Sequence, residues 1–476
     1  MRIKNLKEIK GIFKKTKNPI FGGAVYAFER LGPEKFIENY NLLSLYNSAE
    51  TALIKKDISL FCLEDKIKKR ESPRNSTSLL LNKETQRYIN EKSKDKKPLI
   101  LVYKSSYKIE KLAKKKNWII AIAPKKFGKK LLENKVNFRK ILKKIKVAPP
   151  PGKIVSLNFL KNRRLSDLER EFGMPFVIQH PGKGGGKGTF FIKNSKVFSF
   201  AKKYLRKERP KEIIISKFIK GPSPSITGCV TRHGILSTRP QYQICDEPLL
   251  NIRPKRGGLF CGHDWSSGGN FSKNILKQAK EAVDRVGTYF KKIGYKGIFG
   301  LDFILDEQSE KLYVVECNPR LLASLPVLTM VQYENGEIPI IAFHLLEYLN
   351  IPYFIDIKKI NSQMWQKKEG AQMFLYNPFK KRAKKKNDFN PGIYLSREKN
   401  LRFLRSAYEL SHIKNTNEFL FTDGVPRKDD ILKGYQRIRI ITKKGVLDRD
   451  YKRVNKKTKE FLKITIKSFK KKFKKI

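Results

Sequence analysis

The clearest pattern in the chain is a pair of apolar runs, residues 298–305 and 312–315, separated by a short polar segment. Two apolar runs of strand length joined by turn-forming residues predict a β-hairpin. If residues 307–311 form the connecting loop, Asp302 lies directly opposite Glu316, with the two Cβ atoms about 5 Å apart. The pattern therefore predicts two carboxylates on one face of a hairpin.

Polar side chains continue along the second predicted strand. Alternation places Asn318 on the same face as Glu316, with Arg320 just beyond, and turns Cys317 towards the opposite, apolar face. Carboxylate and amide oxygens beside a guanidinium suit Mg²⁺ and the phosphates that it carries. A solvated hairpin face with a surface ion pair is the alternative interpretation, and the hairpin alone does not decide between the two.

A second segment, residues 174–192, has the pattern of a strand, a glycine-rich loop and another strand. The loop contains four glycines and two lysines: Gly184, Gly185, Gly186, Gly188, Lys183 and Lys187. Glycines let the backbone adopt positive φ and approach a ligand closely, so successive N–H groups can bind phosphate oxygens. The spacing is not that of a Walker A loop, because Pro181 stands where the first glycine belongs. A plain flexible hairpin tip is the alternative.

Apolar patterning organises the N-terminal and central parts as well. Residues 98–103 and 118–124 read as buried strands on either side of an amphipathic helix at 107–116, which predicts a βαβ unit. The polar stretch 66–97 reads as a charged loop or insertion. The glycine-rich stretch 253–270 is either a loop that closes over a substrate or an ordinary connection. That stretch carries Arg253, Arg256, Asp264 and Trp265.

Towards the C-terminus the apolar pattern indicates two helices and then several strands. Helical spacing of apolar residues predicts helices over 272–293 and 340–349. Strand-like pieces follow at 371–376, 392–395 and 434–441, and these suggest a small C-terminal lid domain.

Composition is typical of a soluble enzyme of two to four domains, since the chain has 476 residues and 40% hydrophobic content. No run approaches the roughly 18 apolar residues of a membrane span, and no signal peptide is expected. The five cysteines show no C-x-x-C pairing, which favours reduced thiols and a cytoplasmic location. The five histidines lack metal-ligand spacing, and only His180 and His263 lie near the predicted site loops.

The charge balance is strongly basic. The chain carries 104 Lys and Arg against 44 Asp and Glu, a formal charge of +60 that is spread along its whole length. The densest basic runs are residues 379–386 and 467–476. We favour solvated lysine faces over nucleic-acid binding as the interpretation of this distribution, since a nucleic-acid site would gather its charge in a stripe or cluster. Binding to nucleic acid is therefore expected only as a non-specific, salt-sensitive attraction.

Taken in order along the chain, four segments resemble the ATP-grasp superfamily. Lys135 precedes a predicted helix that leads to a turn at residues 146–149, and the glycine loop follows. Residues 212–221 are similar to the strand that contacts adenine, and the carboxylate hairpin comes last. The resemblance spans residues 131–345 and looks nearest to the branch of biotin carboxylase and carbamoyl phosphate synthase.

This resemblance implies a fold class and a division of the chain. We expect a mixed α/β (α+β) protein with an ATP-grasp fold. Residues 1–130 would form an N-terminal α/β (pre-ATP-grasp) domain, and residues 131–350 the ATP-grasp domain. Residues 351–476 would form a small C-terminal α+β lid domain with a basic tail.

The resemblance also implies how a nucleotide would bind. Lys135 would contact the ATP phosphates, and the backbone of Lys217 and Ile219 would bind adenine. Loop and strand residues would complete the nucleotide site: Gln179, Lys183, Gly184, Gly185, Gly186, Lys187 and Gly188. This sequence departs from the family at Gln179, where a lysine is usual, and at Ser216, where an acidic residue is usual. One phosphate contact is therefore neutral or is made by a loop lysine, and rate and nucleotide preference are in doubt.

The hairpin residues acquire roles by the same comparison. Asp302 and Glu316 would hold Mg²⁺, with Mn²⁺ as a substitute, and Asn318 would complete the coordination. Asn318 and Arg320 would both act in catalysis. Arg320 would steady the transferred phosphate or an acyl-phosphate intermediate.

The function implied is that of an ATP-dependent carboxylate–amine ligase. ATP would phosphorylate a carboxylate substrate, and an amine or similar nucleophile would displace the phosphate. A bicarbonate-using carboxylase or carbamoyl-phosphate-type enzyme is one alternative. A basic nucleic-acid-binding protein with a degenerate ATP-grasp module, or a regulatory subunit that binds ATP without turnover, are others. We expect small-molecule substrates and no membrane association, and a homodimer is compatible with the family.

Overall fold

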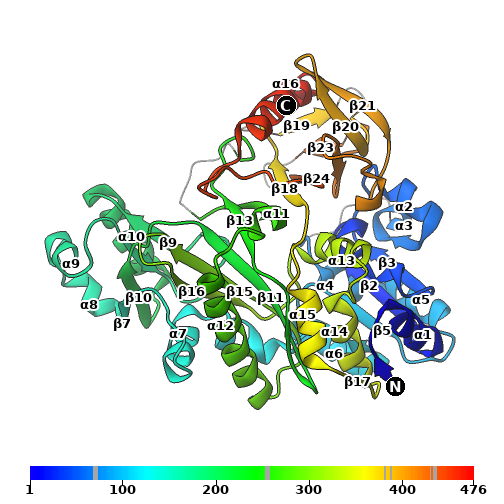
Figure 1. Ribbon diagram of the computed structural model, residues 1–476, viewed down its shortest axis with the longest axis horizontal. Helices are drawn as coiled ribbons and strands as arrows, with labels where there is room; N and C mark the ends of the chain where they lie inside the picture. The colour runs from blue at the N-terminus through cyan, green and yellow to red at the C-terminus, as the bar shows by residue number, and fades with distance from the viewer. Residues whose placement is uncertain are drawn as a thin grey trace.

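The computed structural model describes residues 1–67, 73–251, 258–379, 382–385, 389–428, 430–432 and 437–475. Three sheets make up most of the molecule, as Figure 1 shows. A five-stranded sheet lies near the N-terminus, a four-stranded sheet projects on the opposite side, and an 11-stranded sheet runs between them and up to the C-terminal part. In the described part of the chain no helix is long and apolar enough to cross a membrane.

The N-terminal sheet is parallel, with strand order β4-β3-β2-β5-β6. Its strands are β2 (Ile20–Ala24), β3 (Tyr40–Ser44), β4 (Ser59–Cys62), β5 (Leu99–Val102) and β6 (Ile119–Ile120), and its main helices are α1 (Leu6–Lys15), α2 (Thr51–Asp57) and α6 (Tyr107–Lys116). The predicted βαβ unit is confirmed as β5, α6 and β6, because β5 and β6 pair in parallel. Its second strand is only two residues long and therefore shorter than predicted.

The prediction of a charged loop at residues 66–97 is wrong. Residues 68–72 lie outside the described part, but two helices follow, α4 (Ser76–Leu81) and α5 (Lys83–Ser93). Asn75 and Asn82 cap their N-termini by accepting backbone N–H bonds. Leu79 and Ile89 are fully buried, so a few apolar side chains hold helices whose other faces are polar.

The four-stranded sheet is antiparallel, with order β7-β10-β8-β9. Its strands are β7 (Gly152–Ser156), β8 (Phe176–Gln179), β9 (Thr189–Ile192) and β10 (Glu212–Lys217), and α9 (Leu165–Phe172) and α10 (Ser195–Glu208) accompany it. The strand, glycine loop and strand predicted over 174–192 are confirmed as β8 and β9. This unit has a hydrophobic cluster of its own, separate from the two larger clusters of the molecule.

The large sheet contains the predicted carboxylate hairpin at one edge. The strands in order are β16 (Lys311–Asn318), β15 (Gly297–Asp306), β11 (Ser223–Thr231), β13 (Gln241–Cys245), β14 (Phe260–Asp264), β18 (Ala371–Tyr376), β24 (Arg437–Thr442), β22 (Phe419–Thr422), β20 (Gly392–Arg397) and β21 (Asn400–Ser406). The eleventh strand, β12 (Gly234–Ser237), pairs with β11 outside this order. Beside it lie the two predicted helices, α12 (Lys273–Lys292), capped by Ser272, and α14 (Ile340–Leu349), and both predictions are confirmed.

The sheet continues without a break past the predicted boundary at residue 350. β14 pairs with β18 in antiparallel fashion, and β18 pairs with β24. The strands predicted at 371–376 and 392–395 are confirmed, whereas residues 433–436 of the third predicted strand lie outside the described part. The C-terminal strands therefore extend the same sheet that carries the hairpin.

One further prediction needs correction. The stretch 253–270 is not one loop, because β14 and a short helix, α11 (Trp265–Gly268), occupy its second half. Arg253 and Arg256 lie outside the described residues. Buried Asp264 accepts backbone N–H bonds from Val446 at 2.7 Å and Leu447 at 2.9 Å, so its role is structural.

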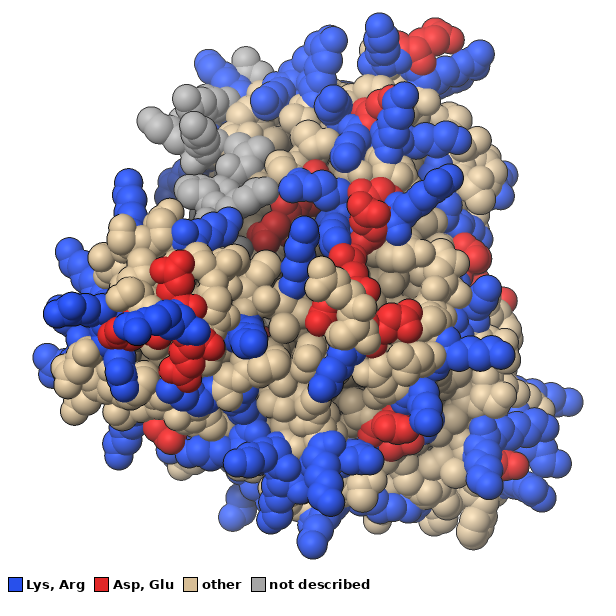
Figure 2. Space-filling model, turned by 60° about the vertical axis from the view of Figure 1, so that its left-hand side comes forward, with Lys and Arg blue, Asp and Glu red and all other residues tan. Residues whose placement is uncertain are grey.

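The predicted basic tail is folded. Residues 456–472 form α16 (Lys456–Lys472), and β25 (Phe473–Lys475) pairs with β19 (Ala383–Lys385). Phe469 and Phe473 are buried and stack on each other, with ring centroids 4.0 Å apart. Figure 2 shows Lys and Arg side chains scattered over the whole visible face, with fewer Asp and Glu between them.

Candidate active site

A cleft of about 660 Å³ lies between the four-stranded sheet and the large sheet. Gln179 and Lys217 line it from the small sheet, and Asp302 lines it from the hairpin. His263 and Arg437 line it from the strands that continue towards the C-terminus. The cleft thus receives side chains from segments that are far apart in sequence.

The hairpin pairs Asp302 with Glu316, as predicted, but through a different register. The turn is one residue tighter than expected, because Asp306 pairs with Lys311. A β-bulge at Val315 then inserts one extra residue in the second strand and restores the pairing of Asp302 with Glu316. Cys317 is buried in the apolar cluster on the opposite face, which confirms the predicted alternation.

Two amides hold the Asp302 carboxylate. Gln243 Nε2 donates to Oδ1 at 2.6 Å, and Asn318 Nδ2 donates to Oδ2 at 2.8 Å. Burial, followed by the like charge of Glu316, raises the pKa of Asp302 to about 6. A cation between the two carboxylates would remove this repulsion, so the residues present fit a divalent metal.

Lys135 is the buried cation of this group. Its ammonium lies 3.0 Å from Glu316 Oε2 and donates to the carbonyl of Lys183 at 3.2 Å. The lysine begins α7 (Lys135–Lys144), whose N-cap is Asn134. The helix start and the hairpin therefore place an ammonium against one of the predicted metal ligands.

Arg320 is held by its own hairpin and by residues of the N-terminal part of the chain. It donates to Asn318 Oδ1 at 2.6 Å, and its guanidinium lies 4.7 Å from the Tyr103 ring centroid. Glu133 Oε1 is 3.9 Å from Arg320 Nε and also accepts from Lys104 Nζ at 2.7 Å. An aromatic face and a carboxylate thus hold the guanidinium towards the cleft that it lines.

The glycine loop reaches the cleft through two of its residues. Gly185 and Gly186 line the cleft and adopt positive φ of 63° and 73°. Gly188 is required for a different reason, since a Cβ there would lie 2.7 Å from the Cβ of Lys183. Lys183 itself pairs with Glu208, Nζ to Oε2 at 2.6 Å. Of the predicted loop residues, Lys183, Gly184, Lys187 and Gly188 do not line the cleft.

The predicted adenine segment lies along the same cleft. Lys217 and Ile219 both line it, and Phe191 and Phe218 contribute aromatic rings whose centroids are 5.7 Å apart. The N–H of Lys217 donates to Pro151 at 2.8 Å. The N–H of Ile219 has no hydrogen-bond partner among the described residues, so it is the donor available to a ligand.

Some site residues had no clear signal in the sequence. Gln243 and Glu133 reach the site only through tertiary structure. Tyr103 follows the carboxyl end of the parallel strand β5, a position where ligands bind in α/β sheets, and this rule would have found it. In the described part of the chain no three His, Cys, Asp or Glu side chains gather as a metal site. A metal here would therefore depend on Asp302, Glu316 and amide or ligand oxygens.

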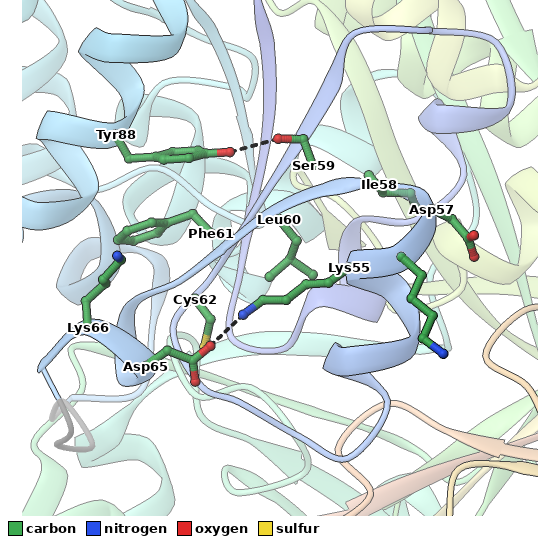
Figure 3. A pocket seen from close by; sticks show the side chains of 11 residues that line it. Lys55, Asp57, Ile58, Ser59, Leu60, Phe61, Cys62, Asp65, Lys66 and Tyr88 are labelled. Carbon is green, nitrogen blue, oxygen red and sulfur yellow. Dashed lines mark hydrogen bonds and ion pairs between the residues drawn. The ribbon is translucent and has the colours of Figure 1, made fainter.

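A second pocket, of about 570 Å³, lies at the edge strand β4. Figure 3 shows two contacts between its polar groups: Lys55 Nζ donates to Asp65 at 2.6 Å, and the hydroxyls of Ser59 and Tyr88 lie 2.9 Å apart. Among the described residues that line it there is no arginine and no facing pair of carboxylates, so the cleft at the hairpin is the candidate active site.

Comparison with known sequences agrees with this assignment. The family model of the ATP-grasp domain matches residues 132–324. The chain is 23% identical over 173 residues to butirosin acyl-carrier protein–L-glutamate ligase of Niallia circulans, covering 35% of this chain and 39% of that protein. It is 26% identical over 195 residues to formate-dependent phosphoribosylglycinamide formyltransferase of Methanocella arvoryzae, covering 40% and 44%. The aligned segments span less than half of either relative.

Solved structures share the fold over most of the chain. Biotin carboxylase of Campylobacter jejuni superposes with a TM-score of 0.57 at 14% identity, covering 89% of this chain and 87% of that one. Phosphoribosylamine–glycine ligase of Thermotoga maritima gives a TM-score of 0.55 at 15% identity, covering 89% and 91%. At these identities the likeness concerns the fold. Together with the matched family, it establishes that residues 132–324 form an ATP-grasp domain.

Proposed function

We propose that the protein is an ATP- and Mg²⁺-dependent ligase that joins a carboxylate to an amine or similar nucleophile. The observation that carries the proposal is the convergence of Asp302, Glu316, Asn318 and Arg320 at one end of a cleft whose other walls suit a nucleotide. The glutamate ligase and the phosphoribosylamine–glycine ligase among the similar proteins support the same reaction class.

Each group has a distinct task in this proposal. Asp302 and Glu316 would hold the metal, which would offset charge on the nucleotide phosphates. Lys135 would bind a phosphate oxygen, since its ammonium already lies beside Glu316. Arg320 would bind the carboxylate oxygen that accepts the phosphoryl group, because its guanidinium is held at the end of the same hairpin.

The adenine base would bind through one backbone donor and two aromatic rings. The Ile219 N–H would donate to the base, and the rings of Phe191 and Phe218 would cover its faces. Gln179 lines the cleft and donates to Thr189 Oγ1 at 3.4 Å, so it would supply a neutral contact where a lysine would supply a charge.

A bicarbonate-using carboxylase is a second candidate. The biotin carboxylase domain of 2-oxoglutarate carboxylase from Hydrogenobacter thermophilus, solved with MgADP and bicarbonate, covers 90% of this chain with a TM-score of 0.54. At 15% identity this likeness concerns the fold alone, so the choice between bicarbonate and a larger carboxylate depends on experiment.

The test is release of ADP and phosphate, screened across amino acids, peptides and bicarbonate. Hydroxylamine would trap an activated carboxylate as its hydroxamate and identify the acid that is phosphorylated. Glu316→Gln should be inactive, and the exposed Glu398→Gln serves as the matched control. Absence of carboxylate-dependent ADP release across the screen would overturn the ligase proposal.

A further inference from the structure

The strands that continue the large sheet beyond residue 350 bring a second set of side chains to the cleft. His263 on β14 pairs with Gln372 on β18, and Phe374 and Tyr376 follow Gln372 on the same face. Arg437 pairs with Tyr376 across the next strand junction, and His263, Tyr376 and Arg437 all line the cleft. The proposed function does not use any of these residues.

A buried chain of hydrogen bonds fixes the orientation of the Gln372 amide. Arg439 donates to Asp423 Oδ2 from Nε at 2.9 Å and from a terminal nitrogen at 2.6 Å, and it also donates to Gln372 Oε1. A guanidinium can only donate, so the oxygen of the Gln372 amide must face Arg439. The amide nitrogen therefore faces His263.

This orientation also fixes the tautomer of His263. Gln372 Nε2 lies 2.8 Å from His263 Nδ1 and 3.3 Å from the carbonyl of Ala323. Because the amide nitrogen donates, Nδ1 must accept, and the ring proton belongs on Nε2. Burial, followed by the charge of Arg439, lowers the pKa of His263 to about 3, so the ring stays neutral near neutral pH.

His263 lines the cleft, and its Nε2–H group is left without a partner by the described residues. Among the described residues none forms a hydrogen bond with His263 Nε2, although the side chain is only 6% exposed. The rings of Phe260 and Trp265 flank the imidazole at 4.8 Å and 5.8 Å between centroids. A buried donor held between apolar rings is suited to an acceptor atom on a ligand.

The guanidinium of Arg437 packs on a buried aromatic ring. Arg437 lies over the Phe374 ring, 3.9 Å from its centroid, and the Phe374 ring is 5.6 Å from that of Phe260. The charges of Tyr376, Asp423 and Glu29 outweigh its burial and raise the pKa of Arg437, but in the described part of the chain no carboxylate lies within ion-pair distance of it. Of the described residues, Arg320 beside the hairpin and Arg437 on β24 therefore bring guanidinium groups to the cleft.

We propose that the carboxylate substrate carries a second anionic group, which Arg437 binds, and an acceptor oxygen, which receives the Nε2–H of His263. The substrate class is thus a small diacid rather than a simple monocarboxylic acid. This inference rests on the proposed function, because Arg320 would bind the carboxylate that is activated. Gln372, Arg439 and Asp423 are positioning residues that keep the His263 donor in place.

The first experiment measures binding, with succinate and acetate as probes, in the presence of a non-hydrolysable ATP analogue and Mg²⁺. Wild-type protein should bind succinate at least about tenfold more tightly than acetate, since the second carboxylate adds a charge-assisted contact. Arg437→Gln should remove that preference and leave acetate binding unchanged. The exposed Arg397→Gln is the matched control and should behave as wild type.

His263 is tested by a pair of variants. His263→Phe keeps a ring but loses the donor and should weaken succinate binding about tenfold. His263→Gln retains an amide donor and should recover most of that loss, and it is the informative variant if His263→Phe folds poorly. Affinity for the ATP analogue should stay within about twofold in both, and His412→Phe, at a half-exposed site, is the control.

The tautomer has a direct spectroscopic readout. With only five histidines in the chain, histidine-selective ¹⁵N labelling resolves each ring, and the His263→Gln spectrum assigns the signal. Wild type should show protonated Nε2 and unprotonated Nδ1, and the Nε2–H signal should shift when succinate is added. Gln372→Glu should move the proton to Nδ1, because a carboxylate at this position accepts.

Three results would overturn the inference: equal affinity for succinate and acetate, an equal effect of Arg437→Gln on both, or a protonated Nδ1 in the wild type. These outcomes are separate from failure of the ligase proposal. Carboxylate-dependent ADP release with monocarboxylates alone would leave the ligase standing and refute the diacid. Selective succinate binding without any ADP release would support the diacid site and refute the ligase proposal.

Discussion

Acidification should weaken metal binding at the hairpin well above the pH at which an ordinary aspartate titrates. Burial, followed by the charge of Glu316, raises the pKa of Asp302 to about 6. The ionised form binds a cation and the protonated form does not. Affinity for the metal is therefore full above neutral pH and is lost as the pH falls through about 6.

The size of the effect follows from this pKa. Between pH 7 and about pH 5 the ionised fraction of Asp302 falls about tenfold, so the apparent affinity for Mg²⁺ or Mn²⁺ should fall about tenfold. An aspartate with an unperturbed pKa of about 3.9 would lose less than about 10% of its affinity over the same range. The two cases differ by a factor that calorimetry resolves.

The assay is a titration of Mn²⁺ into protein saturated with a non-hydrolysable ATP analogue, at several pH values. The nucleotide also titrates in this range, so the quantity to compare is the ratio of wild-type to Asp302→Asn affinity. That ratio should fall about tenfold as the pH drops from 7 to about 5. Glu316→Gln should move the midpoint to lower pH. A ratio that stays constant would show that Asp302 carries no raised pKa or no metal.

Three further outcomes are expected. Glu316→Gln should reduce ADP release at least about a hundredfold without changing the circular dichroism spectrum. Hydrogen exchange across residues 182–188 should slow when a non-hydrolysable ATP analogue binds, because the loop N–H groups then meet phosphate oxygens; unchanged exchange at saturation would remove the loop from the nucleotide site. Arg320→Lys should cut turnover about tenfold to a hundredfold and leave affinity for heparin unaltered. Replacing the exposed Lys467, Lys470 and Lys471 by Gln should lower the affinity for heparin and leave turnover unaltered. Sequence-selective nucleic-acid binding at physiological salt would contradict the expectation that polyanion binding is non-specific.

The hairpin shows how far the sequence predicts the site. Alternation and turn residues were sufficient to place Asp302, Glu316 and Asn318 together. The predicted loop was nevertheless one residue too long, and the bulge at Val315 compensates for that difference. A bulge has no reliable signature in a single strand, because it depends on how two strands twist against each other. The pairing was therefore correct although the register leading to it was not.

Contacts between distant segments were beyond the reach of local patterns. Gln243 binds Asp302 across 59 residues of sequence, and Tyr103 meets Arg320 only because the N-terminal sheet packs against the hairpin. The helices within 66–97 were missed because their buried stripe is narrow and most of their residues are polar. Pattern reasoning depends on wide apolar faces and strict alternation, and it fails where a few side chains determine the packing.

The unbroken pairing of β14 with β18 has a consequence for dividing the chain into fragments. A fragment ending at residue 350 would leave β14 as a bare edge strand, with its N–H and C=O groups open to pairing with a second molecule. The Asp264 carboxylate would also lose the Val446 and Leu447 donors. Such a fragment should aggregate, so the ATP-grasp domain and the C-terminal strands should be expressed as one unit.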